Sequence, residues 1–118
     1  FACFYNTSYV KLQDAYVSEV GEYYGNWTTI GYSVGTNGQT NNFSFADQLA
    51  TSSAALPNAA TDAWVATSKV ALNDCAAGKT WTIKVAKGTT GGAIAYSAAY
   101  SDETNCKPLT PNFEKVAQ

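Results

Sequence analysis

The side chains with the most chemistry in this sequence are its three cysteines, Cys3, Cys75 and Cys106. Thiols join into disulfides in oxidising compartments and otherwise act as metal ligands or nucleophiles. Cys75 and Cys106 enclose two alternating apolar runs, whereas Cys3 stands apart near the start of the chain. The arrangement predicts a Cys75–Cys106 disulfide, with two ordinary buried thiols as the alternative. Cys3 is then a free thiol, a competitor for the other two, or a link between chains.

Acid–base and metal chemistry lack their usual residues. The chain has no histidine, the commonest general base and metal ligand, so neither a Ser-His nor a Cys-His pair can form. Two carboxylate pairs, Glu19 with Glu22 and Asp102 with Glu103, have the residue types of a glycosidase. Such pairs on loops are far more often solvated surface groups, and no acidic loop has calcium-binding spacing. We therefore expect no catalytic residues, no metal site and no cofactor.

Aromatic side chains are the other candidates for function. Eight tyrosines, three tryptophans and five phenylalanines could form a sugar-stacking platform or a subunit interface. The favoured interpretation is that most of them form the core of a small β-rich domain.

A predicted hairpin of residues 80–86 and 93–100 positions the two central cysteines. Both runs alternate apolar with small or polar residues, which is typical of strands, and the glycine-rich residues 87–92 form the turn. If the turn is centred between Thr90 and Gly91, the numbers of paired residues sum to 181 and both apolar faces fall on one side. This register pairs Trp81 with Tyr100, Ile83 with Ala98, Val85 with Tyr96 and Cys75 with Cys106.

The segments before this hairpin give weaker signals. Residues 1–9 are aromatic and turn-rich, and residues 9–24 have roughly helical apolar spacing, but their β-branched and tyrosine content favours a loop with one or two helical turns. Asn37-Gly38 predicts a hairpin of residues 28–34 and 40–45. Residues 46–58 predict a short helix capped by Asp47.

The remaining segments complete the predicted sheet. Residues 63–72 read as a strand with Trp64 packed inward. Residues 107–118, with two prolines, predict an extended tail anchored by Phe113.

Length and composition indicate a single exported domain. The 118 residues predict one domain, 1–118, made of an N-terminal loop segment (1–24), a sheet (25–106) and an extended tail (107–118). The fold class is mainly β within the α+β family: an antiparallel sheet of about four strands with long loops and a disulfide-closed C-terminal region. A net charge of −2 with no arginine excludes nucleic-acid recognition, and no apolar run approaches the length of a membrane span.

This order resembles the globular head of a bacterial type IV pilin. The residues that carry the resemblance are 25–34, similar to the first strand segment of pilins from metal- and sulfate-reducing bacteria, and 75–111 with its two cysteines and Lys107-Pro108-Leu109-Thr110-Pro111. The resemblance implies a sheet, a disulfide-closed end and a long hydrophobic N-terminal helix. It covers most of the chain.

One departure from the family stands out, because no hydrophobic N-terminal helix is evident. The chain therefore resembles the separately encoded C-terminal half of a split pilin, as in Geobacter-like bacteria, whose partner is a short helical pilin; a truncated head is the alternative. The resemblance implies an exposed apolar groove that the partner helix fills. Candidate groove residues are Phe1, Phe4, Tyr5, Tyr9, Trp27 and Ile30.

Two functions follow. The first is a non-enzymatic structural subunit of a type IV pilus or pseudopilus on a Gram-negative cell, which binds the helical partner and further copies of itself but neither nucleic acid nor membrane. The alternative is a secreted carbohydrate-binding or adhesin module that uses exposed aromatics.

Overall fold

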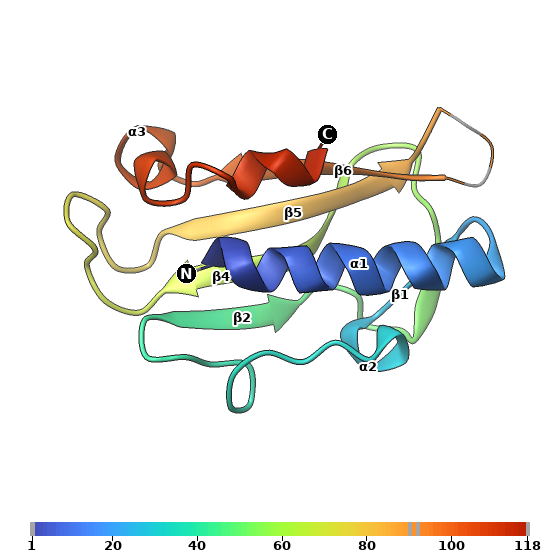
Figure 1. Ribbon diagram of the computed structural model, residues 1–118, viewed down its shortest axis with the longest axis horizontal. Helices are drawn as coiled ribbons and strands as arrows, with labels where there is room; N and C mark the ends of the chain where they lie inside the picture. Colours follow the sequence, from blue (N-terminus) through green and yellow to red (C-terminus); the bar gives the residue numbers. More distant parts are fainter. Residues whose placement is uncertain (1, 90, 92, 118) are drawn as a thin grey trace.

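The computed structural model describes residues 2–89, 91 and 93–117, with side chains described between Tyr5 and Lys115. One helix, α1, lies along one face of an antiparallel sheet with strand order β2-β4-β5-β6, and the C-terminal elements run beside it (Figure 1). A smaller sheet pairs β1 with β3. The elements are α1 (Ala2–Val20), β1 (Tyr23–Gly25), α2 (Trp27–Ile30), β2 (Phe43–Asp47), β3 (Ser53–Ala55), β4 (Thr61–Ser68), β5 (Thr80–Lys87), β6 (Ile94–Tyr100), α3 (Glu103–Cys106) and the 3₁₀ helices η1 (Lys107–Leu109) and η2 (Phe113–Ala117). The fold is α+β, with most of its elements strands.

The predicted hairpin and its disulfide are confirmed. β5 pairs with β6 in the predicted register, with Trp81 opposite Tyr100 and Val85 opposite Tyr96. The Cys75–Cys106 disulfide joins residues whose Cα atoms lie 4.9 Å apart, and both cysteines are fully buried. The bridge therefore fastens α3 and the C-terminal segment to the loop that leads into β5.

The N-terminal segment is a helix, so the predicted loop over residues 1–24 and the prediction of a head without any N-terminal helix are both wrong. Among the described residues, α1 is not apolar enough to be the long hydrophobic helix of a pilin. α1 runs for 19 residues and buries a line of side chains three or four positions apart. Tertiary packing of this line outweighs the low helix propensity of the segment. Two of its members, Asn6 and Gln13, are polar, which hides the pattern in the sequence. The buried line is Asn6, Tyr9, Gln13 and Val17.

The predicted hairpin of residues 28–34 and 40–45 is also wrong. Trp27–Ile30 is a helical turn: the Asn26 side chain accepts a hydrogen bond of 2.8 Å from the Thr29 N–H, and Gly31 ends the turn at a φ of 79°. These two caps outweigh the alternating pattern. Asn37-Gly38 does form a tight turn, but β2 pairs with β4 instead of with residues 28–34.

Of three other predicted segments, one is confirmed, one is wrong and one is confirmed only in part. The strand over 63–72 is confirmed as β4, although it begins at Thr61 and ends at Ser68. The helix over 46–58 is wrong, because Asp47 closes β2 and β3 pairs with β1. The tail is coiled into η1 and η2 instead of extended, although Phe113 is fully buried as predicted.

Aromatic rings fill the space between α1 and the sheet, which confirms their favoured role as core. All three tryptophans are buried, Trp64 and Trp81 completely. The Phe113 ring lies 5.9 Å from Trp64 and 5.5 Å from Tyr100, so the C-terminal segment packs on the same face as α1. The Trp81 indole N–H donates to the Thr110 hydroxyl over 2.9 Å, which ties that segment to β5.

Candidate functional site

The predicted interface residues converge beneath α1. The Tyr9 ring lies 5.5 Å from Tyr32 and 6.5 Å from Trp27, and the Tyr5 ring lies 5.3 Å from Phe45. We call Trp27, Tyr32 and Phe45 the aromatic groove. Edge-to-face contacts of this kind add about 1 kcal/mol each to the burial of the rings.

The groove is closed, so the expectation of an exposed groove that a partner helix fills is wrong for this part of the surface. Tyr9 is 1% exposed, Trp27 9% and Ile30 8%, because α1 of the same chain lies in the groove. The helix therefore shields these aromatic side chains from solvent. Phe1 lies outside the described residues, as do the side chains of Phe4 and Cys3.

Gln13 fastens α1 in this position, a role that the sequence did not reveal. Its side-chain N–H₂ donates to the Tyr9 hydroxyl and to the Gly25 carbonyl, and its carbonyl oxygen accepts from the Gly25 N–H, each over 2.9 Å. The amide thus satisfies both backbone groups of Gly25 inside the protein. A Cβ at Gly25 would lie 2.9 Å from the Ile30 side chain, so only glycine lets the strand come this close.

Replacing Gln13 by methionine tests this clamp, because methionine has a similar shape but no hydrogen-bonding amide. We expect Gln13→Met to lower the free energy of unfolding by about 2 kcal/mol, since the buried Gly25 groups lose their partner. Lys11→Met places the same side chain at an exposed position of α1 and should leave stability within about 0.5 kcal/mol. Urea unfolding measures both, and equal effects of the two variants would contradict the clamp.

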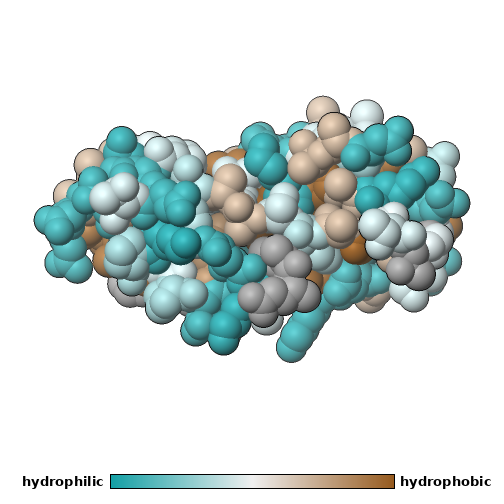
Figure 2. Space-filling view, turned by 90° about the horizontal axis from the view of Figure 1, so that it is seen from above, coloured by the Kyte–Doolittle hydropathy of each residue, from teal (hydrophilic) through white to brown (hydrophobic). Residues whose placement is uncertain are grey.

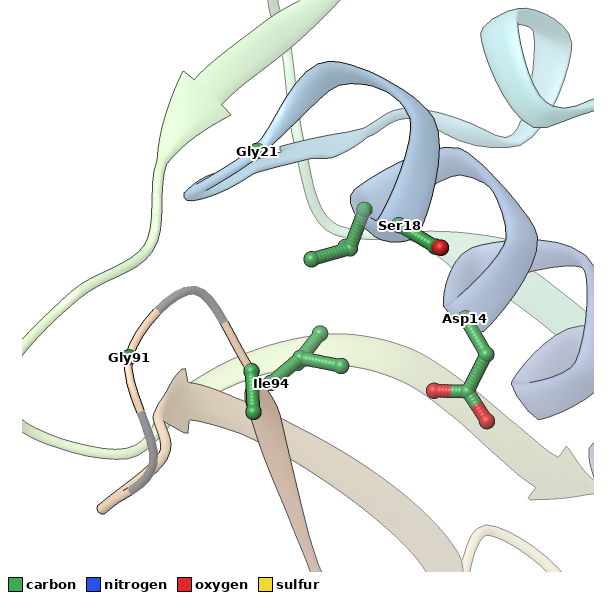
Figure 3. A pocket seen from close by; sticks show the side chains of 7 residues that line it. Asp14, Ser18, Gly21, Gly91 and Ile94 are labelled. Carbon is green, nitrogen blue, oxygen red and sulfur yellow. The ribbon is translucent and has the colours of Figure 1, made fainter.

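A hollow of 460 Å³ opens beside the C-terminal half of α1 (Figure 3). The helix contributes Asp14 and Ser18 on one side, and Ile94 of β6 faces them from the other. The Tyr96 hydroxyl donates to the Asp14 carboxylate over 2.8 Å. Burial of the ring, together with this carboxylate, raises the pKa of Tyr96, so the hydroxyl keeps its proton and remains a donor. The lining residues are Asp14, Val17, Ser18, Gly21, Gly91, Ala93 and Ile94.

Three of the four carboxylates in the two pairs have structural partners. Asp102 caps α3 by accepting from the Asn105 N–H over 3.2 Å, and its hydrogen bonds with Asn105 lower the Asp102 pKa. Glu103 and Glu22 make surface ion pairs, with Lys107 at 3.6 Å and Lys87 at 3.5 Å. Within the described residues, no three cysteine or acidic side chains gather in a way that could hold a metal ion.

Comparison with protein-family models, curated proteins and solved structures finds no match to this chain. Among the described residues, no helix combines the length and the hydropathy needed to cross a bilayer.

Proposed function

We propose that this chain is a non-enzymatic structural subunit of an extracellular filament of the type IV pilus or pseudopilus class, exported by a Gram-negative cell. The observation that carries the proposal is α1 seated in the aromatic groove of an antiparallel sheet whose C-terminal segment is closed by the Cys75–Cys106 disulfide. A sheet and a disulfide-closed end are two features that resemblance to a pilin head implies, and α1 supplies a long N-terminal helix that is not apolar enough to cross a membrane.

The arrangement supports a mechanical role. Helix, sheet and C-terminal segment share one core, held by the Gln13 clamp and the disulfide. Disulfides persist in oxidising compartments, which supports export. Because α1 fills the groove, the short helical pilin partner packs against the outside of the domain, and the hollow beside α1 receives its side chains.

The carbohydrate-binding alternative loses its stacking groups. Trp27, its leading candidate, is buried, and so are Trp64 and Trp81. Among the described large apolar side chains, Tyr23 is an exposed aromatic at 50%, with Val20 and Val70 the other exposed members. One ring offers too little surface for a sugar-stacking platform.

Matched arginine substitutions on α1 test the filament proposal. We expect Ser18→Arg, which blocks the hollow, to reduce incorporation into surface filaments at least about tenfold, equivalent to a contact worth roughly 1.4 kcal/mol. Ser8→Arg, at an exposed position of the same helix away from the hollow, should assemble normally. Immunogold electron microscopy with antibodies to the folded domain, on cells that co-express the helical pilin, measures incorporation.

Two results would overturn the proposal. The first is wild-type protein that never labels filaments and stays monomeric beside the helical pilin. The second is filaments of unchanged number and appearance when the chain is deleted. Incorporation of Ser18→Arg at the wild-type level would instead show that the partner contacts a different surface.

A further inference from the structure

β6 is the outer strand of the four-stranded sheet; η2 packs against it, but no strand pairs with its outer edge. Residues 94–100 (IAYSAAY) carry no charge, no proline and no register shift against β5. Every one of them keeps some exposure, whereas the facing residues Trp81, Ile83 and Val85 of β5 are fully buried. Seen from above, the left end of the surface is hydrophilic, and tan and brown side chains appear among hydrophilic ones toward the middle (Figure 2). Proteins normally guard such edges against strand pairing.

The hydrogen-bond ladder shows which backbone groups face outward. The Gly88 N–H donates to the Ala93 carbonyl, and the Ser101 N–H donates to the Thr80 carbonyl. The backbone groups of the odd-numbered residues of β6 therefore bond to β5. Because an antiparallel ladder alternates, the N–H and C=O groups of even-numbered residues point away from the sheet. Among the described residues, none of these outward backbone groups has a partner. They belong to Ile94, Tyr96, Ala98 and Tyr100.

The opposite edge of the sheet is closed by the chain itself. The Phe45 N–H of β2 donates to the Gly38 carbonyl over 2.7 Å, and the Thr40 N–H donates to the Phe43 carbonyl over 2.9 Å. Residues 38–40 therefore occupy outward hydrogen-bonding groups of Phe43 and Phe45 in β2. Any pairing between copies through β6 stops at two chains, since the second edge cannot add another strand.

We propose that β6 pairs antiparallel with β6 of a second copy of this chain, centred on Ser97. In this register Ile94 faces Tyr100, Ala95 faces Ala99 and Tyr96 faces Ala98, so apolar residues meet on the α1 side and small residues on the other. All seven residues of the strand stay paired, and the outward groups form about eight backbone hydrogen bonds. This pairing does not rest on the filament function.

The uncharged, self-complementary sequence of β6 fits a second copy as the occupant. Asp102 and Glu103 follow β6 at one end, and Lys87 lies opposite Ile94 at the other. Antiparallel pairing places no like charges in facing positions, because the strand itself carries none, and Lys87 and Glu103 keep their ion pairs with Glu22 and Lys107. One strand edge buries less area than a stable dimer needs, so the dissociation constant should lie between micromolar and millimolar.

Substitutions at Ser97 test the pairing. Ser97 lies on the sheet face away from α1 and opposite Lys84 of β5, so a glutamate there has a cation beside it in the monomer. In the dimer, two glutamates would face each other across the two-fold axis. We expect Ser97→Glu to weaken dimerisation at least about tenfold and the matched, uncharged Ser97→Gln to dimerise like the wild type. Sedimentation equilibrium over increasing protein concentration measures this.

Amide hydrogen exchange locates the interface within the same strand. The amides of Tyr96 and Ala98 should become more protected as concentration rises, whereas those of Ala95 and Ala99, already bonded to β5, should not change. A wild-type monomer at all concentrations would overturn the proposal. A dimer whose affinity is unchanged by Ser97→Glu would also overturn it, as would protection of Tyr96 and Ala98 that requires an added extended peptide of different sequence. The filament proposal would stand in each case.

Discussion

Removing the Cys75–Cys106 disulfide is expected to lower the free energy of unfolding by about 3–4 kcal/mol, because the bridge closes a loop with a sequence separation of 31 residues in the unfolded chain. The change is Cys75→Ala with Cys106→Ala. Alanine is chosen because both positions are fully buried and a serine hydroxyl there would need a partner.

The comparison is best made in a Cys3→Ala background, so that no thiol remains to form a different bridge. Urea unfolding followed by tryptophan fluorescence reports the stability. Reduction of the bridged protein should shift the urea midpoint in the same direction as the double substitution. A loss below about 1 kcal/mol would show that the unfolded chain is already compact around these two residues.

Alkaline pH should unfold the domain over a narrow range, because the phenols beneath α1 resist ionisation. Burial raises the pKa of Tyr32 to about 12, with the hydrogen bond from Trp64 opposing the shift, and burial also raises the pKa of Tyr9. Both residues are at most 5% exposed. A tyrosine in the unfolded chain ionises near pH 10.

The direction of the effect follows from these pKa values. Below pH 10 the phenols are protonated in both states, so they do not change stability with pH. Between pH 10 and about 12, the unfolded chain releases protons that folded Tyr32 and Tyr9 retain, and the unfolded state is favoured. Each tyrosine then removes about 1.4 kcal/mol per pH unit, so the pair removes about 3 kcal/mol at pH 11.

Tyrosinate absorbance and near-ultraviolet circular dichroism, recorded together during a base titration, test this expectation. Loss of tertiary signal should coincide with a cooperative rise in absorbance between pH 10 and 12. Tyr23→Phe, which alters an exposed ring, is the control and should leave the unfolding midpoint unchanged. Gradual titration of all eight tyrosines with retained tertiary signal would contradict the prediction.

The hairpin of β5 and β6 could be predicted because its signals are local. Alternation, a glycine-rich turn and matching distances to the two cysteines all lie between Cys75 and Cys106, and they agree with one another. The resulting register, with Ile83 opposite Ala98, places the apolar residues on the face that α1 covers.

α1 escaped prediction for the opposite reason. Its buried line includes Asn6 and Gln13, and Gln13 is explained only by Gly25, which lies on the other side of a turn. When only the sequence pattern is read, such polar residues are expected to face solvent. In the fold, Gln13 is buried and has hydrogen-bond partners. The Trp27–Ile30 turn was missed because its caps compete with an alternating pattern of similar strength.

The sequence predicted which residue types form the candidate site, but not that α1 of the same chain covers it. Tyr9 and Trp27 do lie together at an aromatic groove, as the sequence indicated. The conformation of residues 2–20 decides which helix fills that groove. Because the helix α1 was not predicted, the expected partner surface was wrong as well.

The disulfide also determines how the domain would respond to tension along a fibre. A force applied to the two ends of the chain passes from Cys75 to Cys106 through the sulfur atoms and bypasses β5 and β6. About 100 Å of contour length, at roughly 3.4 Å per residue, is thereby withheld from extension. Residues 76–105 cannot be extended while the bridge is intact, so extension is confined to the chain before Cys75 and after Cys106. The bridge therefore keeps β5 and β6 in one closed loop even when β4, the neighbour of β5 in the sheet, is pulled away.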